Sequence, residues 1–185
     1  LAVCFFFWFF FFFVCVVCSV FPFDVRFDLV KAGVGDLANV IVLDSSHYIV
    51  SGATFPTYFL KQDDPVARIQ MELDVSLFGS RIAPFFGIAR RFVGTEPTCP
   101  LTSGYNEAMK RILPLHGVEV VEIERKMEAD SAISASRVRE LIACGDMSVF
   151  SGLETLVPAT TLAYLRSEAA APIRKKLQMM RGVTQ

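Results

Sequence analysis

Residues 133–139 combine side chains that could hold a phosphate chain. The stretch reads Ile-Ser-Ala-Ser-Arg-Val-Arg, with Ser134, Ser136 and Arg139 at the predicted start of a helix. Free amides at a helix N-terminus, hydroxyl donors and a guanidinium together make a receptor for anionic oxygens. Arg137 and Arg139 are two positions apart, roughly 200° around a helix, so only one of them can face a bound anion. The alternative is that Ser136 is an ordinary N-cap and both arginines are solvated.

A second candidate is the loop of residues 92–97, Phe-Val-Gly-Thr-Glu-Pro, in which Gly94, Thr95 and Glu96 follow a predicted strand. In α/β proteins, ligands bind beyond the carboxyl ends of the parallel strands. The loop is therefore predicted to contact a ligand, and a plain turn is an equally good interpretation.

Three other sequence patterns are weaker candidates for a functional site. Residues 33–38 match G-x-G-x-x-A, but a dinucleotide site needs a strand before this motif and a helix after it, and the predicted order here is reversed. His47 and His116 are isolated, and no cysteine or carboxylate stands at a ligand spacing from either, so no metal site is predicted. Cys15 and Cys18 form a single Cys-x-x-Cys and are interpreted as packed thiols.

These candidate sites require a scaffold of alternating helices and strands. In one predicted helix, Val66, Ile69, Leu73 and Leu77 share one face. Strands separated by helices indicate an α/β fold with a parallel sheet and flanking helices, held in one layered domain. The periodicity predicts helices over 24–32, 66–78, 105–113 and 136–143, a helical turn over 54–61, a buried strand over 39–43, and strands over 91–93 and 118–123.

The composition limits the class of protein. The 185 residues carry 18 basic and 19 acidic side chains, a net charge of -1, so there is no electrostatic drive toward nucleic acid. Hydrophobic residues make up 53% of the chain, which excludes a disordered chain. Five cysteines, an odd number, favour a reducing compartment, and we expect a cytoplasmic protein.

The chain opens with a Phe-rich apolar run at residues 1–18. Its length permits a membrane-spanning helix, although no basic residue precedes it and no Trp or Tyr belt flanks it. A strand of a parallel sheet, over about residues 8–17, is an equally good interpretation, and a low-complexity accident is a third. Association with a membrane is thus expected only through residues 1–18.

The predicted domain division has three parts: the apolar run at 1–18, an α/β domain at 19–165, and a basic tail at 166–185. The tail has five basic residues and one acidic residue. Its Ala-rich, Pro-containing start predicts a frayed and solvated terminus.

Blocks along most of the chain resemble the C-terminal ligase domain of the citrate lyase ligases. Three are most distinctive: Ala-Thr-Phe-Pro-Thr-Tyr-Phe-Leu-Lys at 53–61, Arg-Phe-Val-Gly-Thr-Glu-Pro at 91–97, and Ala-Ile-Ser-Ala-Ser-Arg-Val-Arg at 132–139. The similarity keeps one register from about residue 8 to residue 165, and so is far more specific than any single motif. The further blocks are at 19–23, 29–33, 48–51, 82–84, 120–123 and 156–165.

The resemblance implies a nucleotidyltransferase with a Rossmann-like parallel sheet that binds ATP. Such ligases activate acetate as acetyl-adenylate, with Mg²⁺ present, and release pyrophosphate. They then pass the acetyl group to the prosthetic-group thiol on the acyl carrier subunit of citrate lyase. The resemblance also implies that the residues around the predicted helix start contact the ATP phosphates and that the loop at 94–96 lies beside the nucleotide. The implied catalytic residues are Ser134, Ser136 and Arg139, and the implied nucleotide contacts are these three with Ile133, Gly94, Thr95 and Glu96.

The sequence departs from the family pattern in one important respect. The family has a His-x-Gly-His loop that supplies imidazoles to the triphosphate, and an N-terminal acetyltransferase-like domain; neither is found in these 185 residues. We therefore expect a truncated or mis-started ligase domain, incomplete at its N-terminus. The loss of each donor to the developing charge lowers the rate by about 10²-fold or more, so poor catalysis is expected.

Two alternatives to the ligase stay open. One is a non-catalytic nucleotide-binding remnant, tethered to a membrane if residues 1–18 span it. The other is a different small-molecule adenylyltransferase, for which the Ala-Thr-Phe-Pro block at 53–56 would not be expected.

Overall fold

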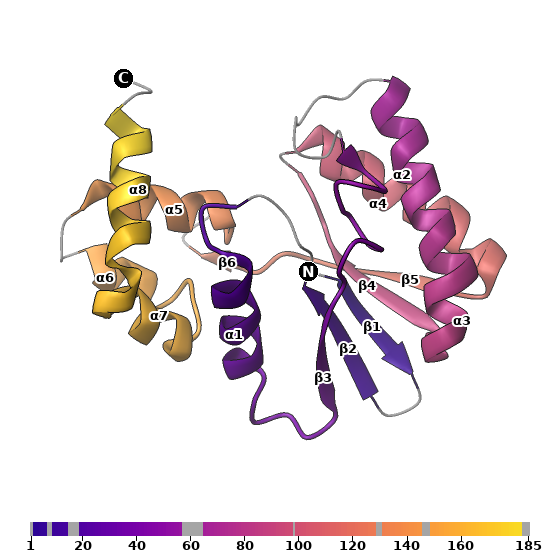
Figure 1. Ribbon diagram of the computed structural model, residues 1–185, viewed down its shortest axis with the longest axis horizontal. Helices are drawn as coiled ribbons and strands as arrows, with labels where there is room; N and C mark the ends of the chain where they lie inside the picture. The colour runs from indigo at the N-terminus through magenta and orange to yellow at the C-terminus, as the bar shows by residue number, and fades with distance from the viewer. Residues whose placement is uncertain are drawn as a thin grey trace. The chain divides into compact units, whose positions relative to one another are not determined.

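A computed structural model of the chain describes residues 2–6, 9–14, 19–56, 65–97, 99–128, 131–145 and 149–182. They form two compact units (Figure 1). The sheet unit comprises Leu1–Cys18 and Leu37–Glu124, and the helical unit comprises Ser19–Asp36 and Arg125–Gln185. The predicted Cys15 and Cys18 thiols and most of the helical turn predicted at 54–61 lie outside the described residues.

The sheet unit contains a five-stranded sheet in the order β3-β2-β1-β4-β5 (Figure 1). Strands β2 and β3 are parallel, as are β4 and β5, whereas β1 is antiparallel to both of its neighbours. The predicted α/β class is confirmed, and the sheet is mixed because an antiparallel strand lies between the two parallel pairs. The strands are β1 Ala2–Phe6, β2 Phe9–Val14, β3 Val40–Asp44, β4 Arg90–Gly94 and β5 Glu119–Ile123.

The Phe-rich run supplies two of these strands. The strand interpretation is confirmed for β2, where Phe11 and Phe13 are buried on the face that packs against helices. In the part of the chain that the structure describes, no helix is long and apolar enough to cross a membrane. Strand β3, predicted to be buried, is instead an edge strand with Ile41 exposed, because β2 pairs with it on one side only.

Helices α2 and α4 pack against each other and against the sheet. The core side of α2 carries Ala67, Met71 and Val75, whose spacing of four also fits one helix face. The face marked by Val66, Ile69 and Leu73 is the exposed one. The helical elements of this unit are α2 Pro65–Leu77, the π-helix η2 Phe78–Ile82, α3 Ala83–Phe86, α4 Pro100–Ile112 and the 3₁₀ helix η3 Leu113–His116.

His116 has a packing contact with Gly79. A Cβ atom on Gly79 would lie 2.6 Å from Cδ2 of the His116 ring, so the ring approaches η2 only because a glycine stands there. This close approach gives one of the two isolated histidines a structural role.

The helical unit is built mainly of helices (Figure 1). Their apolar side chains form its core. Residues 33–38 begin at the last residue of α1 and end before β3, in the order that argued against a dinucleotide motif. The elements are α1 Phe23–Gly33, β6 Met127–Glu128, β7 Ser131–Ala132, α5 Ala135–Cys144, α6 Val149–Leu153, α7 Ala159–Arg166, the 3₁₀ helix η4 Glu168–Ala170 and α8 Ala171–Gly182.

The prediction of a frayed, solvated tail is wrong for residues 166–182. Helix α8 packs on α5, and Ile173 and Leu177 are buried in the helical core. Their spacing of four places them on one helix face, and Ala170 of η4 is buried as well. Arg174 donates to the carbonyl oxygens of Leu165 and Ser167 at 2.6 and 2.7 Å, where it caps the end of α7.

Candidate functional site

Ser134 is the N-cap of α5. Its backbone is extended, with φ -136° and ψ 152°, and its Oγ accepts a hydrogen bond from the Arg137 amide at 3.2 Å. The interpretation in which Ser136 caps the helix is therefore wrong. Because a hydroxyl can accept and donate at once, the Ser134 proton stays available for a ligand oxygen.

The two arginines of this segment have different surroundings. Arg137 Nη1 donates to the carbonyl oxygen of Glu128 at 3.0 Å, which ties this side chain to strand β6. Arg139 Nη2 donates to Ser136 Oγ at 3.0 Å on the exposed surface of the first turn. Arg137 thus has a structural contact with the backbone, whereas Arg139 and Ser136 form a pair at the surface.

The start of α5 presents several donors together. Helix geometry leaves the amides of Ala135 and Ser136 without an acceptor in the helix, while the Val138 amide already bonds to the Ser134 carbonyl. These amides, the Ser134 hydroxyl and the Arg139 guanidinium suit a phosphate oxygen, and the positive end of the helix dipole adds to the attraction.

Ile133 has a different role from its neighbours. Its amide donates to the Lys126 carbonyl at 3.0 Å, and its side chain packs against the helical core. The residue positions the loop that leads into α5, and its contact with a nucleotide stays a prediction.

Gly94, Thr95 and Glu96 lie at the carboxyl end of β4, in the sheet unit rather than the helical unit. The Thr95 amide donates to the Ile123 carbonyl at 2.9 Å, and Asn106 Nδ2 donates to the Gly94 carbonyl at 2.9 Å. These bonds hold the loop against β5 and α4. The loop is thus firmly placed at the sheet edge where parallel strands end.

Cys99 is a feature of this loop that the sequence analysis did not single out. Its amide donates to Glu96 Oε1 at 3.2 Å, and its Sγ accepts from Thr102 Oγ1 at 3.4 Å. The hydrogen bond from Thr102 lowers the pKa of the Cys99 thiol. The Cys-Pro pair before an amphipathic segment could have indicated that a helix starts directly after Cys99, because proline favours the first turn of a helix.

A buried polar cluster joins three elements of the sheet unit. Tyr105 of α4 donates to Asp74 Oδ2 of α2 at 2.5 Å and accepts from Arg91 Nη2 of β4 at 3.4 Å. All three side chains are buried, and the Arg91 guanidinium lies over the Phe78 ring, 4.3 Å from its centroid. Burial raises the pKa of Tyr105 far above its usual range, so the hydroxyl stays a donor.

Asp74 also fixes the loop after β3. Its Oδ1 accepts the Val50 amide at 2.8 Å, and Val50 has a φ of 45°, in the left-handed region that β-branched residues rarely adopt. In the same loop, buried Ser51 donates to the His47 carbonyl at 2.7 Å and accepts the amides of Ala53 and Thr54. The loop is therefore held by buried hydrogen bonds.

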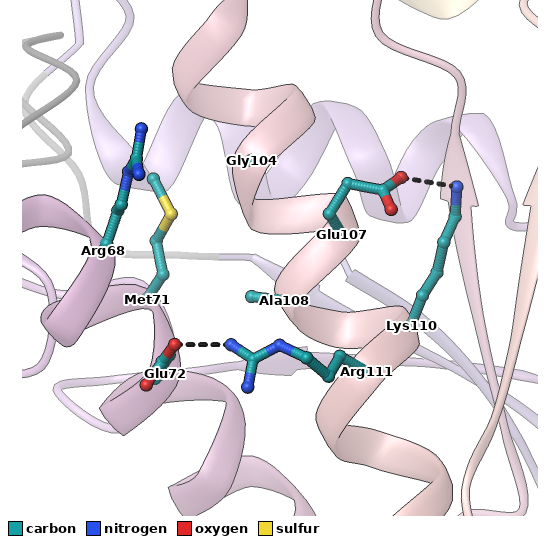
Figure 2. Close-up of a pocket in the computed structure, with 8 residues that line it drawn as sticks. All are labelled: Arg68, Met71, Glu72, Gly104, Glu107, Ala108, Lys110 and Arg111. Carbon is teal, nitrogen blue, oxygen red and sulfur yellow. Dashed lines mark hydrogen bonds and ion pairs between the residues drawn. The ribbon is translucent and has the colours of Figure 1, made fainter.

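A groove of about 510 Å³ lies between α2 and α4 (Figure 2). Glu72 of α2 forms an ion pair with Arg111 of α4, and Lys110 pairs with Glu107 and Glu122, each at 2.9 Å. Hydrogen bonds to these two carboxylates raise the pKa of Lys110. The groove thus presents charges of both signs and no concentrated positive field.

Comparison with known proteins assigns the family. The family model described as the citrate lyase ligase C-terminal domain matches residues 6–165. The chain belongs to the citrate lyase ligase family. It is 42% identical over 154 residues to the citrate (pro-3S)-lyase ligase of Escherichia coli (strain K12), an alignment that covers 80% of this chain and 43% of that protein.

Two further citrate (pro-3S)-lyase ligases are similar to the chain. The one from Klebsiella pneumoniae is 41% identical, in an alignment that covers 80% of this chain and 43% of the relative. The one from Haemophilus influenzae (strain ATCC 51907 / DSM 11121 / KW20 / Rd) is 40% identical, in an alignment that covers 80% of this chain and 45% of the relative. The citrate lyase ligase family resemblance is thereby confirmed, and the chain spans less than half of the length of these relatives. No solved structure matches the chain.

Proposed function

We propose that the chain acts as an ATP-dependent acid-thiol ligase on citrate lyase. In this reaction acetate is joined to the prosthetic-group thiol of the lyase acyl carrier subunit, which switches the lyase on. The observation that carries the proposal is the family match over residues 6–165, together with three relatives named as citrate (pro-3S)-lyase ligases. The reaction needs ATP and a free thiol, and a reducing cytoplasm keeps such a thiol reduced.

The proposed chemistry has two balanced steps. An acetate oxygen attacks the α-phosphorus of ATP and pyrophosphate leaves, which gives acetyl-adenylate; the carrier thiol then attacks the acetyl carbon, and AMP leaves. Negative charge grows on the departing pyrophosphate in the first step, and fixed donors aimed at that charge lower the barrier.

Ser134, Ser136 and Arg139 are the proposed donors to the ATP phosphates, with the first amides of α5. The exposed pair of Arg139 and Ser136 and the remaining proton of Ser134 support this assignment. Gly94, Thr95 and Glu96 are proposed contacts of the nucleotide on the strength of the family block at 91–97.

Mg²⁺ is proposed to enter with the ATP phosphates. Among the described residues, no group of three or more His, Cys, Asp or Glu side chains is arranged to hold a metal ion. Mg²⁺ commonly binds through substrate phosphates, waters and only one or two carboxylates, so the chain's donors are compatible with that mode.

These 185 residues are proposed to bind ATP better than they turn it over. The sequence holds no His-x-Gly-His, and its two histidines are far apart at positions 47 and 116. Each missing donor to the developing charge is worth about 10²-fold in rate. The non-catalytic alternative, a nucleotide-binding chain, rests on this same observation.

Titration calorimetry with ATP and Mg²⁺ tests the phosphate site. We expect Arg139→Ala to weaken ATP binding by about tenfold or more, since a charged hydrogen bond contributes about 1.5–3 kcal/mol. Arg137→Ala is the matched control, because its guanidinium is bonded to the Glu128 carbonyl and should leave the affinity nearly unchanged. Equal losses in the two variants would contradict the assignment.

A second measurement separates the ligase from a nucleotide-binding chain. Pyrophosphate release from ATP is followed with acetate present, and mass spectrometry follows the acetylation of the acyl carrier subunit. We expect slow release and a mass gain of one acetyl group on the carrier. ATP binding with neither product would favour the non-catalytic alternative.

A further inference from the structure

The loops that follow β3 and β4 lie at the same edge of the sheet. Strands β2 and β4 are both antiparallel to β1, so they point in the same direction, and each is parallel to its outer neighbour, β3 or β5. These four strands therefore all end at one edge. In α/β sheets, ligands bind beyond the edge at which the parallel strands end.

Two consecutive residues of α4 reach these two loops. Tyr105 donates to Asp74, and the other carboxylate oxygen of Asp74 accepts the Val50 amide in the loop after β3. The next residue, Asn106, donates to the Gly94 carbonyl at the end of β4. Helix α4 thus helps to fix both loops from one place along its length.

Asn106 is a buried polar residue of α4. Its side chain is only 5% exposed, and Nδ2 donates to the Gly94 carbonyl oxygen at 2.9 Å. A buried amide or carbonyl group that loses its hydrogen bond is costly, so this bond constrains both partners. Gly94 is the last residue of β4, and the bond therefore fixes the point at which the chain leaves the sheet and enters the loop at 94–96.

Two further bonds hold the same loop from other elements. The Thr95 amide donates to the Ile123 carbonyl of β5, and the Cys99 amide, at the start of α4, donates to the Glu96 carboxylate. The bond from Asn106 ties the loop to the middle of α4 as well. A loop that is fixed by a strand and a helix keeps its backbone groups in one place for a ligand.

We propose that Asn106 is a positioning residue of the nucleotide site. Through the Gly94 carbonyl, it sets the backbone of residues 94–96, which the proposed function places beside ATP, and the inference rests on that proposed function. Asn106 itself need not touch the nucleotide. Its loss should weaken ATP binding more than its effect on stability explains, because a small displacement of a binding loop has a large effect on binding geometry.

Titration calorimetry with ATP and Mg²⁺ tests the role of Asn106. Asn106→Leu keeps nearly the same volume and removes the donor, and it should weaken ATP binding by about tenfold, since the loop loses a fixed position. Met109→Ala is the matched control. Met109 is a buried core residue of the same helix, so its truncation destabilises the sheet unit by leaving a cavity, but it leaves the bond between Asn106 and Gly94 in place. The affinity of this control should stay within about twofold of the wild type.

A second variant and a second measurement separate positioning from a loss of folding. Asn106→Asp keeps the shape of the side chain without the Nδ2 donor and should weaken ATP binding as Asn106→Leu does. Hydrogen exchange should become faster in the peptide that covers residues 93–97 in both variants, and should stay unchanged there in Met109→Ala. Circular dichroism confirms that each variant is folded.

The possible results distinguish this inference from the proposed function. If the wild type binds ATP and either Asn106 variant binds it equally well, the positioning role is overturned and the proposed function stands. If Met109→Ala binds ATP as weakly as the Asn106 variants, the effect is one of stability, and the positioning role is again overturned. A wild-type chain that does not bind ATP would overturn the proposed function, and the inference with it.

Discussion

The sheet unit and the helical unit bury different kinds of side chain. Among the residues that the structure describes, every buried polar or charged side chain belongs to the sheet unit. The core of the helical unit is built from apolar residues alone in the same set. The buried polar residues are Ser45, Ser51, Thr54, Asp74, Arg91 and Asn106.

This difference separates polar side chains that hold loops in place from polar side chains that a ligand can reach. A buried polar group is costly unless it is fully hydrogen-bonded, and a satisfied network gives rigidity in return. In the sheet unit, Asp74 and Asn106 hold the loops that follow β3 and β4. In the helical unit, the polar groups at the start of α5 stay at the surface, where a ligand can reach them.

The largest effect is expected from removal of the carboxylate in the buried cluster. Asp74→Ala deletes the acceptor of Tyr105 and of the Val50 amide, and it leaves Arg91 buried without that negative charge nearby. We expect a loss of about 3–5 kcal/mol in the free energy of unfolding. Urea denaturation measures the loss, and Glu72→Ala is the exposed carboxylate control.

Hydrogen exchange measured by mass spectrometry shows where the Asp74→Ala effect falls. Protection should drop across α2, α4 and the strands of the sheet unit, while α7 and α8 keep theirs. An equal drop in both units would contradict the difference between them, because it would mean that the two units unfold together.

A smaller effect, with a clear pH dependence, is expected at Tyr105. Its pKa in the folded protein is raised above the unfolded value of about 10, so its contribution to stability is complete below that pH and is lost as pH rises further. Tyr105→Phe should cost about 1–2 kcal/mol at neutral pH, since Asp74 loses a donor. The free energy of unfolding of the variant should fall less steeply above pH 10 than that of the wild type. Parallel slopes in alkaline urea titrations would contradict this.

The smallest effect is expected at the N-cap of α5. Ser134→Ala removes the acceptor of the Arg137 amide and should lower the stability of the helical unit by about 1 kcal/mol. Ser136→Ala, two positions on, is the control, because its exposed hydroxyl bonds to a side chain and caps no amide. Thermal melting of the two variants measures the difference. A larger loss for Ser136→Ala would overturn the assignment of the cap.

The hydrophobic periodicity and the positions of glycine and proline predicted much of the scaffold. The segments built around α1, α2, α4, α5, β4 and β5 were predicted as the right type of element, with boundaries a few residues away. The start of α4 was placed five residues late because its first turn, Pro100 to Gly104, is weakly patterned. The tail was misjudged because its basic charge masked the buried face of Ile173 and Leu177.

The candidate site was predictable only where it is local in sequence. Ser134, Ser136 and Arg139 lie within six consecutive residues, so spacing predicted that only one of Arg137 and Arg139 faces an anion. The choice of Arg139 came from the family resemblance and stays a prediction. The cluster of Asp74, Tyr105 and Arg91 was not predictable, because its members are separated by as many as 31 positions and come together only when α2, α4 and β4 pack.

The position of β1 in the sheet has a practical consequence. Strands β2 and β3 reach β4 and β5 only through β1, so the first residues of the chain join the two halves of the sheet. Their removal would leave a pair of two-stranded ribbons, which are rarely stable alone, with four open edges of unpaired backbone. Expression of shortened versions that begin after Phe6 would therefore favour aggregation, and the Phe-rich segment belongs in any recombinant form of this domain.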